Sequence, residues 1–184
     1  MRVLHVGLTL SLSKGEAPRR RTVGWTTAPN PAQFRAMNDA ADLEPLTGFK
    51  DLVGYRVSEW REGHAEVVCD IRPELLNRSG VLHGGVIVTC LDAAGGYSGI
   101  YCAVPGHVRR SVTVSFHVHF MGQVTAGRLT AIGRLKKAGR RLFFTEVDLF
   151  DEAGELIASG DGVYRYRAGS ENAEGVPDDG RMAR

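Results

Sequence analysis

The sequence lacks the features that would place the protein in several large classes. Its 23 Lys and Arg residues nearly balance its 21 Asp and Glu residues, which leaves a formal net charge of +2. That balance gives no reason to expect a nucleic acid or a membrane surface as a partner. No segment of the sequence reaches the roughly 20 apolar residues that are needed to span a bilayer. We therefore expect a protein with neither nucleic-acid nor membrane partners.

Cysteine is also scarce, with only Cys69, Cys90 and Cys102 present. An odd number of cysteines without CxxC spacing argues against a disulfide framework or a structural zinc site. We expect three reduced, mostly buried thiols in a cytoplasmic protein. The mildly apolar residues 3–12 resemble the core of a signal peptide in length. However, three arginines at 19–21 follow where a small-residue cleavage site would be expected, so we do not predict secretion.

The length of 184 residues and the hydrophobic content of 43% predict one globular domain. Residues 1–30 are rich in Arg, Ser, Thr, Gly and Pro, and residues 168–184 contain few large aliphatic side chains. Both compositions are typical of segments that do not pack. We predict a flexible N-terminal extension over 1–30, a folded domain over 31–167 and a flexible C-terminal tail over 168–184.

Hydrophobic periodicity gives the order of elements within the domain. A weak helical pattern covers residues 31–46, and residues 85–101 form a long helix that is apolar almost all round and should be buried. Strands are predicted at 49–57, 64–71, 111–120, 129–135, 142–150 and 156–166. Two strands, one buried helix and four more strands predict an α+β fold. In it, an antiparallel sheet wraps around one long central helix.

The predicted strand 111–120 alternates between apolar and polar residues. Thr113, Ser115, His117 and His119 should therefore share one face, opposite the valines and phenylalanines. His117 and His119 could together bind a metal, but no third ligand is evident nearby. We predict no metal site and no cofactor.

The second half of the predicted helix, residues 93–99, is rich in alanine and glycine. Each glycine in a helix interior costs about 1 kcal/mol relative to alanine. Such a cluster indicates close approach, either by another part of the backbone or by a ligand.

The segment from Asn77 to Gly85, followed by Asp92, carries the strongest chemical signal. His83-Gly84-Gly85 opens the predicted helix, where unpaired backbone N–H groups and a partial positive charge favour an anionic ligand atom. Asp92 lies two turns further on, and a carboxylate on an apolar helix is costly unless it is paired or functional. Each feature alone has a simpler interpretation: a tight loop, an acid bonded to a neighbouring strand, and a turn asparagine.

Together these residues resemble a known family. The pattern Asn77-x-x-Gly80-x-x-His83-Gly84-Gly85, with an acid in the following helix, is similar to the phenylacetate-pathway (PaaI-like) branch of the hot-dog thioesterase superfamily. The resemblance covers residues 49–166 and includes the segments 52–55, 111–114 and 158–160. It implies a hot-dog fold and hydrolysis of an acyl-CoA or aryl-acyl-CoA to the free acid and CoA.

The resemblance also implies a role for each residue of the pattern. Asp92 would activate water or attack the thioester carbonyl itself, and the backbone N–H groups of Gly84 and Gly85 would polarise that carbonyl. The supporting residues would be Asn77, which orients water or the thioester, His83, which shapes the site, and Thr113, whose hydroxyl lies near the acid. In this family the helix start of one subunit faces the acid of its partner, which implies a homodimer or a dimer of dimers.

Four basic residues surround a hairpin turn predicted at Ala138-Gly139, where they could meet the phosphates of CoA or form a solvated turn: Lys136, Lys137, Arg140 and Arg141. Two other functions stay open. One is a hydratase or dehydratase that acts on acyl-thioesters, and the other is a non-catalytic acyl-CoA-binding or assembly protein. The His83-Gly-Gly sequence argues against the first, and the presence of both Asn77 and Asp92 argues against the second.

Overall fold

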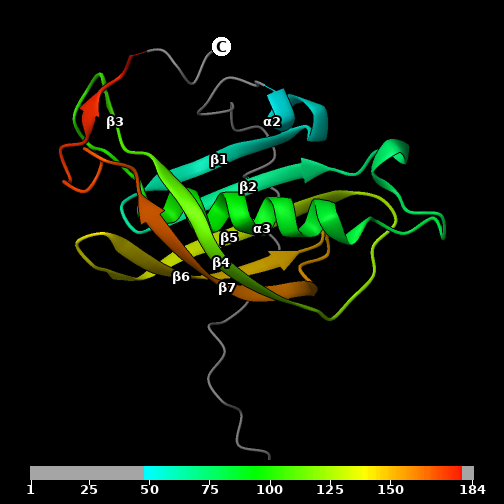
Figure 1. Cartoon of the computed structure of the whole chain (residues 1–184). Helices are drawn as coiled ribbons and strands as arrows, with labels where there is room; N and C mark the ends of the chain where they lie inside the picture. The colour runs from blue at the N-terminus through cyan, green and yellow to red at the C-terminus, as the bar shows by residue number, and fades with distance from the viewer. Residues whose placement is uncertain (1–47, 180–184) are drawn as a thin grey trace, which may run out of the picture.

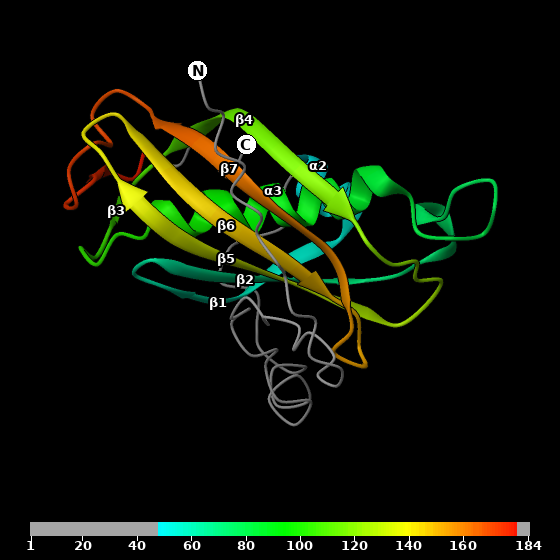
Figure 2. The same ribbon diagram turned by 90° about the horizontal axis from the view of Figure 1, so that it is seen from below.

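The computed structural model describes residues 48–179, and its main feature is a sheet that curves around one helix (Figure 1). All six strands of that sheet pair antiparallel, in the order β1-β2-β5-β6-β7-β4 (Figure 2). The strands of the sheet are β1 (Tyr55–Arg61), β2 (His64–Asp70), β4 (Ser111–Phe120), β5 (Arg128–Ala138), β6 (Leu142–Phe150) and β7 (Leu156–Tyr166). The remaining elements are α2 (Gly48–Val53), the 3-10 helix η2 (Pro73–Leu75), α3 (Gly84–Gly99), β3 (His107–Val108) and β8 (Val176–Pro177). The predicted α+β architecture is confirmed.

Helix α3 provides one wall of the core, as its apolar sequence predicts. Its buried residues are Val86, Ile87, Cys90, Leu91, Ala94, Gly95, Ser98 and Gly99. They pack against inward-facing residues of the sheet such as Val67, Ala131 and Val147, none of which is exposed. The sheet covers one side of α3, so its other side and the neighbouring edge strand β4 are left for a site. No helix in residues 48–179 has both the length and the apolar character to cross a bilayer.

The glycines of α3 explain how the helix approaches the sheet so closely. A Cβ added at Gly99 would overlap the ring of Phe143, and one added at Gly95 would overlap the Tyr164 hydroxyl. Both aromatic side chains are fully buried. The close approach predicted from the small residues is therefore made at these two positions by side chains of the sheet, and not by a ligand.

The prediction of a strand over residues 49–57 was wrong in its first half. Residues Gly48–Val53 form α2, and β1 begins only at Tyr55, after a turn at Gly54 whose φ is 83°. A short apolar run does not distinguish a strand from a helix by its period alone. Phe49, Leu52 and Val53 have helical spacing, and of these only Val53 is buried.

The predicted flexible tail also differs from the structure. Residues Val176–Pro177 form β8, which pairs with β3, and Ser170 is buried. The Arg109 guanidinium holds the segment by donating to the carbonyls of Ser170 and Glu171. Polar, glycine-rich sequence packs here because an arginine satisfies its backbone carbonyls. The helix predicted at 31–46 and the extension predicted at 1–30 lie outside the described residues.

Candidate functional site

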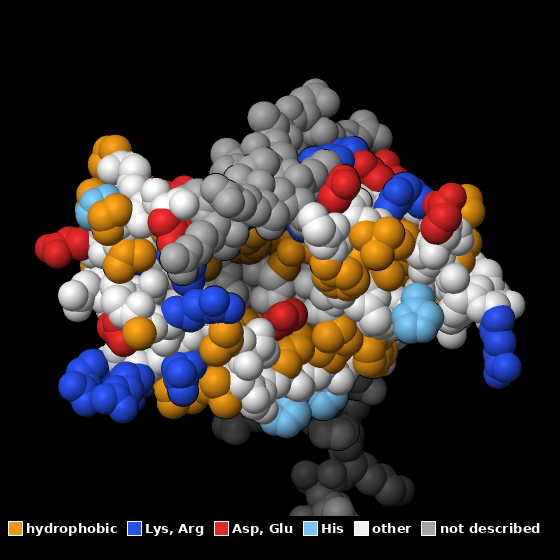
Figure 3. All heavy atoms as spheres, turned by 45° about the horizontal axis from the view of Figure 1, so that its top comes forward, with side chains coloured by type: hydrophobic (Ala, Val, Ile, Leu, Met, Phe, Trp, Pro, Cys, Tyr) orange, Lys and Arg blue, Asp and Glu red, His pale blue; other side chains and the backbone are white. Residues whose placement is uncertain are grey.

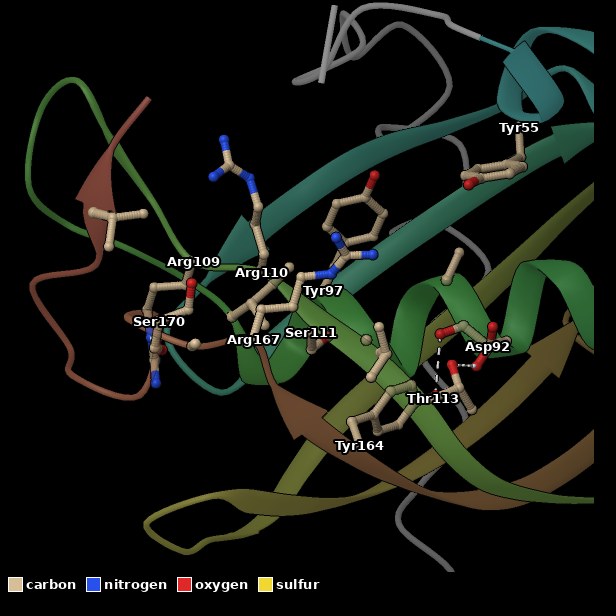
Figure 4. Close-up of a pocket in the computed structure, with 16 residues that line it drawn as sticks. Tyr55, Asp92, Tyr97, Arg109, Arg110, Ser111, Thr113, Tyr164, Arg167 and Ser170 are labelled. Carbon is tan, nitrogen blue, oxygen red and sulfur yellow. Dashed lines mark hydrogen bonds between the residues drawn. The ribbon is translucent and has the colours of Figure 1, made fainter. Parts of the chain in front are cut away.

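A cavity of about 590 Å3 opens between α3 and β4. Asp92 and Gly96 line it from the helix, Thr113 from β4, Tyr55 from β1, and Arg167 from the segment after β7. Figure 4 shows Asp92 and Thr113 together at one end of this cavity and Arg167 towards the other. In the surface view, an acidic side chain lies in a hollow between hydrophobic side chains, with basic side chains to one side (Figure 3). The cavity therefore combines one carboxylate with apolar walls and a basic end.

Two hydroxyl groups hold Asp92 in place. Thr113 Oγ1 donates to Asp92 Oδ1 at 2.9 Å, and the Tyr164 hydroxyl donates to the Asp92 backbone carbonyl at 3.0 Å. Burial raises the pKa of Tyr164, and the nearby Asp92 carboxylate raises it further, so this phenol stays protonated and remains a donor. Asp92 is half-buried, and its carboxylate keeps acceptor positions that face the cavity. It is therefore positioned to accept a proton from a bound water or to contact a substrate carbon.

A β-bulge aims Thr113 at Asp92. The pairing of β4 with β7 shifts register between Thr113 and Ser115, which leaves Val114 without a partner and 59% exposed. After the shift Phe116 points inward, where its ring meets Tyr164 edge-on. Thr113 and Phe116 consequently lie on the same face of β4, the face towards α3, although strict alternation predicts opposite faces. That prediction was wrong because a bulge reverses the facing of every residue beyond it.

His83 caps the start of α3. Its Nδ1 accepts a hydrogen bond of 2.9 Å from the Gly85 N–H, so the Gly85 donor is occupied. Among the hydrogen bonds of the described residues, none is donated by the Gly84 N–H. The sequence predicts both amides as donors to a substrate oxygen, whereas the structure leaves that of Gly84 available. A helix N-terminus also adds a partial positive charge there.

Asn77 orders the loop that leads to this helix. Its Oδ1 accepts from the N–H groups of Ser79 at 2.8 Å and Val81 at 3.4 Å. The simpler interpretation, a turn residue, is therefore correct for the side-chain oxygen. Within the described residues the side-chain NH2 group of Asn77 donates no hydrogen bond, so it can still donate to a ligand.

The predicted site residues form two groups within one chain. Asp92 and Thr113 line the cavity, whereas Asn77, His83, Gly84 and Gly85 do not. Eight residues of helix at 1.5 Å per residue separate Gly84 from Asp92 by about 12 Å. One thioester carbonyl cannot contact both at once, because reacting atoms must approach to about 3–3.5 Å. A site that uses both groups needs a second copy of the chain.

The four basic residues predicted to contact CoA lie around the hairpin turn, away from the Asp92 cavity. Lys136, Lys137, Arg140 and Arg141 are exposed at the β5–β6 turn and do not line the cavity. Lys136 forms an ion pair with Glu146. The structure thus does not bring these four side chains to Asp92.

Three arginines that the sequence reasoning missed line the cavity instead. Arg109 is fixed by backbone carbonyls and lies 4.5 Å from the Tyr166 ring centroid, and Arg110 pairs with Asp178 and Asp179. Arg167 is exposed, and no ion pair is formed by its guanidinium within residues 48–179. The adjacent Arg109 and Arg110, directly before β4, are the feature of the sequence from which basic residues at the site could have been predicted.

The two histidines considered as a metal pair are exposed on the edge strand. His117 lies 3.6 Å from the carboxylate of Asp161, and both side chains are largely exposed to solvent. His119 is exposed as well. Neither histidine lines the cavity around Asp92.

Comparison with known proteins gives a consistent set of relatives. Residues 79–158 match the Thioesterase superfamily. The chain is 31% identical over 127 residues to the Thermoplasma volcanium protein named "Putative esterase TV1331", across 69% of this chain and 93% of that one. It is 29% identical over 131 residues to human "Acyl-coenzyme A thioesterase 13", across 69% of this chain and 86% of that one.

A solved structure has the same fold. A mutant form of the phenylacetic acid degradation protein PaaI from Thermus thermophilus superposes with a TM-score of 0.55 at 24% identity. The match covers 64% of this chain and 96% of that one. At this level of identity the likeness concerns the fold, namely a central helix wrapped by an antiparallel sheet.

Proposed function

Because the chain belongs to the thioesterase superfamily, we propose that it hydrolyses acyl-CoA thioesters with Asp92 as the catalytic carboxylate. The observation that carries this proposal is the half-buried Asp92 carboxylate, held by Thr113 at the end of a cavity with apolar walls. A carboxylate in such a position can act as a general base or as a nucleophile.

The reaction needs a base at one side of the thioester carbonyl and a donor at the other. Asp92 would accept a proton from water as the water oxygen adds to the carbonyl carbon. The Gly84 N–H at the start of α3 would stabilise the negative charge that develops on the carbonyl oxygen. The C–S bond then breaks, and the proton passes to the CoA sulfur as the acid leaves. If Asp92 attacks directly, the C–S bond breaks and CoA leaves as the thiolate while an acyl anhydride forms on Asp92. Water then hydrolyses the anhydride to the free acid and the Asp92 carboxylate, and the proton released passes to the thiolate.

We expect the site to form between two copies of the chain. Strand β4 ends the sheet, so its outer edge offers unpaired backbone groups next to the cavity. Exposed apolar side chains line this edge, with Val114 at 59%, Phe120 at 55% and Met121 at 51%. Burying them against a second copy would remove apolar surface from water and bring its helix start towards Asp92. The assembly would be a homodimer or a dimer of dimers.

The substrate would bind with its CoA part at the basic end of the cavity. Arg167 is exposed there and can donate two parallel hydrogen bonds to a phosphate. The hairpin residues Lys136, Lys137, Arg140 and Arg141 remain a second predicted phosphate contact, which a neighbouring subunit would have to bring close. The acyl group would lie along Gly96 and Tyr97. The cytoplasmic location stays a prediction from the cysteine usage.

The structure also bears on the hydratase alternative. A hydratase would need His83 or another histidine as a base at the reacting carbon, but His83 Nδ1 accepts the Gly85 N–H as a helix cap. Measurements of turnover distinguish a thioesterase from a non-catalytic binding protein.

A panel of acyl-CoAs that spans short, medium and aryl acyl groups tests the proposal. Release of free CoA thiol is measured for the wild type and for Asp92→Asn. We expect Asp92→Asn to lose activity by on the order of a hundredfold or more, because an amide cannot act as a base or nucleophile.

Asp161→Asn is the matched control, since Asp161 is an exposed acid outside the cavity and should keep wild-type activity. Equal activity in wild type and Asp92→Asn would exclude Asp92 as the catalytic group. Hydration of an enoyl-CoA without thiol release would favour the hydratase, and binding without any turnover would favour the binding protein.

A further inference from the structure

A second cluster of ionisable side chains lies on the outer face of the β1–β2 hairpin. Glu59 of β1 and Glu66 of β2 are direct cross-strand partners, and His64 precedes Glu66 by two residues, so it points to the same face. A register shift between Val57 and Glu59 creates this arrangement. Val57 faces the core with no exposed area, and the extra residue, Ser58, turns Glu59 outward. None of the three cluster residues lines the Asp92 cavity.

The distances within the cluster suit a metal ion. His64 Nε2 lies 3.1 Å from Glu66 Oε1 and 3.6 Å from Glu59 Oε1. One ligand atom from each residue lies within 4.8 Å of the others. Zinc binds imidazole nitrogen and carboxylate oxygen at about 2.0–2.2 Å, which separates neighbouring ligand atoms by roughly 3.0–3.5 Å. The three side chains can therefore reach one ion without a change in the backbone.

The cluster places two acidic side chains opposite each other on neighbouring strands. Like charges directly opposite each other on neighbouring strands are destabilising, and Glu59 and Glu66 are such a pair. The Glu66 side chain is only 9% exposed, and its buried Oε2 has no hydrogen-bond partner among residues 48–179. A buried, unpartnered carboxylate oxygen is costly. An imidazole N–H can supply Glu66 Oε1, but it leaves Oε2 without a partner.

Two arginines lie close enough to be considered as alternative counter-charges. Arg61 Nε donates to Glu59 Oε1 at 2.7 Å, but the Arg61 side chain is 61% exposed and can rotate away. Arg134, opposite His64 on β5, is paired with Asp148 at 2.8 Å. Neither arginine makes a hydrogen bond to Glu66 within the described residues.

We propose that Glu59, His64 and Glu66 bind a divalent transition-metal ion of the zinc class, which links edge strand β1 to β2. Two carboxylates and a neutral imidazole form a mixed oxygen and nitrogen set that suits Zn2+ better than Mg2+. The ion would neutralise the opposed glutamates, and if Glu66 bound it through both carboxylate oxygens the ion would also be a partner for Oε2. The sequence prediction of no metal site considered the three cysteines and the pair His117 and His119. It missed this site because strand pairing brings Glu59 to His64 and Glu66.

Zinc binding to the full-length chain, measured by calorimetry and by metal content after dialysis, tests the proposal. A Cys102→Ser background is used because Cys102 and His107 both contact the Glu174 carbonyl and would compete for zinc. We expect one Zn2+ per chain and a zinc-dependent rise in Tm, with no effect of Mg2+. Glu66→Gln and His64→Gln should each weaken zinc binding by at least about tenfold to a hundredfold. Arg61→Gln should tighten it, since a competing cation is removed.

His117→Gln is the matched control, because His117 also lies beside a carboxylate but forms no three-ligand group within the part of the chain that the structure describes. It should bind zinc as the parent does. Glu59→Gln provides a further test if Glu66→Gln fails to fold, because the Glu59 side chain is 43% exposed and tolerates replacement. The proposal is overturned if zinc does not bind at a large molar excess, or if binding is unchanged in the Glu66, His64 and Glu59 variants.

Discussion

A mixed dimer of two inactive variants would test whether two subunits share the site. One subunit carries Asp92→Asn and the other carries Gly84→Val. The valine would crowd the Gly84 N–H at the start of α3. Its Cβ would stand 3.3 Å from the ring of Phe120, which is 55% exposed and can move aside, so we expect the fold to survive.

The expected activities follow from the separation of about 12 Å between Gly84 and Asp92 along the helix. Loss of a general base costs about 10²–10⁴-fold, and loss of an oxyanion donor costs about 10²–10³-fold, so each homodimer should have about 1% of wild-type activity or less. In a shared arrangement the mixed dimer places both substitutions in one site and leaves the other intact. It should recover about half of the wild-type turnover.

Two different affinity tags allow the mixed dimer to be purified, and release of free CoA thiol gives its activity. A mixed dimer of wild type with Asp92→Asn serves as the reference, because it should have half of the wild-type activity in either arrangement. If each chain has its own complete site, both sites of the test dimer carry one substitution. Recovery of only about 1% would refute the shared site and the role of the helix start that depends on it.

Three further predictions concern single positions. Thr113→Val removes the donor to Asp92 Oδ1 and should lower kcat/KM by about tenfold, whereas Thr113→Ser should retain activity; equal loss in both would contradict the hydrogen-bond role. Gly99→Ala would force a methyl into the Phe143 ring and should lower the free energy of unfolding in urea by about 1–3 kcal/mol. Its control is Gly96→Ala, whose Cβ would stand 3.5 Å from the Tyr164 ring and which should keep or raise stability. The Arg128 guanidinium lowers the pKa of Asp70 below its ordinary 3.8. The ionised Asp70 therefore stabilises the fold above pH 3.8, and this contribution is lost as the pH falls through the lower pKa of the folded state. Asp70→Asn should flatten the dependence of Tm on pH below about 4.

Much of the fold follows from local sequence. The strands Ser111–Phe120, Leu142–Phe150 and Leu156–Tyr166 have the bounds that the pattern predicts, and α3 differs from the predicted 85–101 by one or two residues at its ends. These segments are long and strongly patterned, so their own residues determine their type. Residues 49–57 were mispredicted because the run is short and its apolar spacing suits a helix as well as a strand.

The candidate site was only partly predictable. Asp92 and the segment from Asn77 to Gly85 stand out because a carboxylate and glycines are unexpected in an apolar helix. The hydrogen bond from Thr113 to Asp92 depends on a bulge, which is a property of the pairing between β4 and β7. The arginines at the basic end of the cavity come from segments that meet only in the folded chain.

The sequence by itself therefore determined the type of each long element and singled out Asp92 as the candidate acid, because periodicity and residue chemistry are local. Only the tertiary structure decided which amide at the start of α3 is available, since the His83 ring bonds to Gly85 and not to Gly84. It also decided that Glu59 stands opposite Glu66, because strand register depends on partners far apart in the chain. The helix itself keeps Gly84 and Asp92 apart, since its rise per residue is fixed by backbone hydrogen bonds.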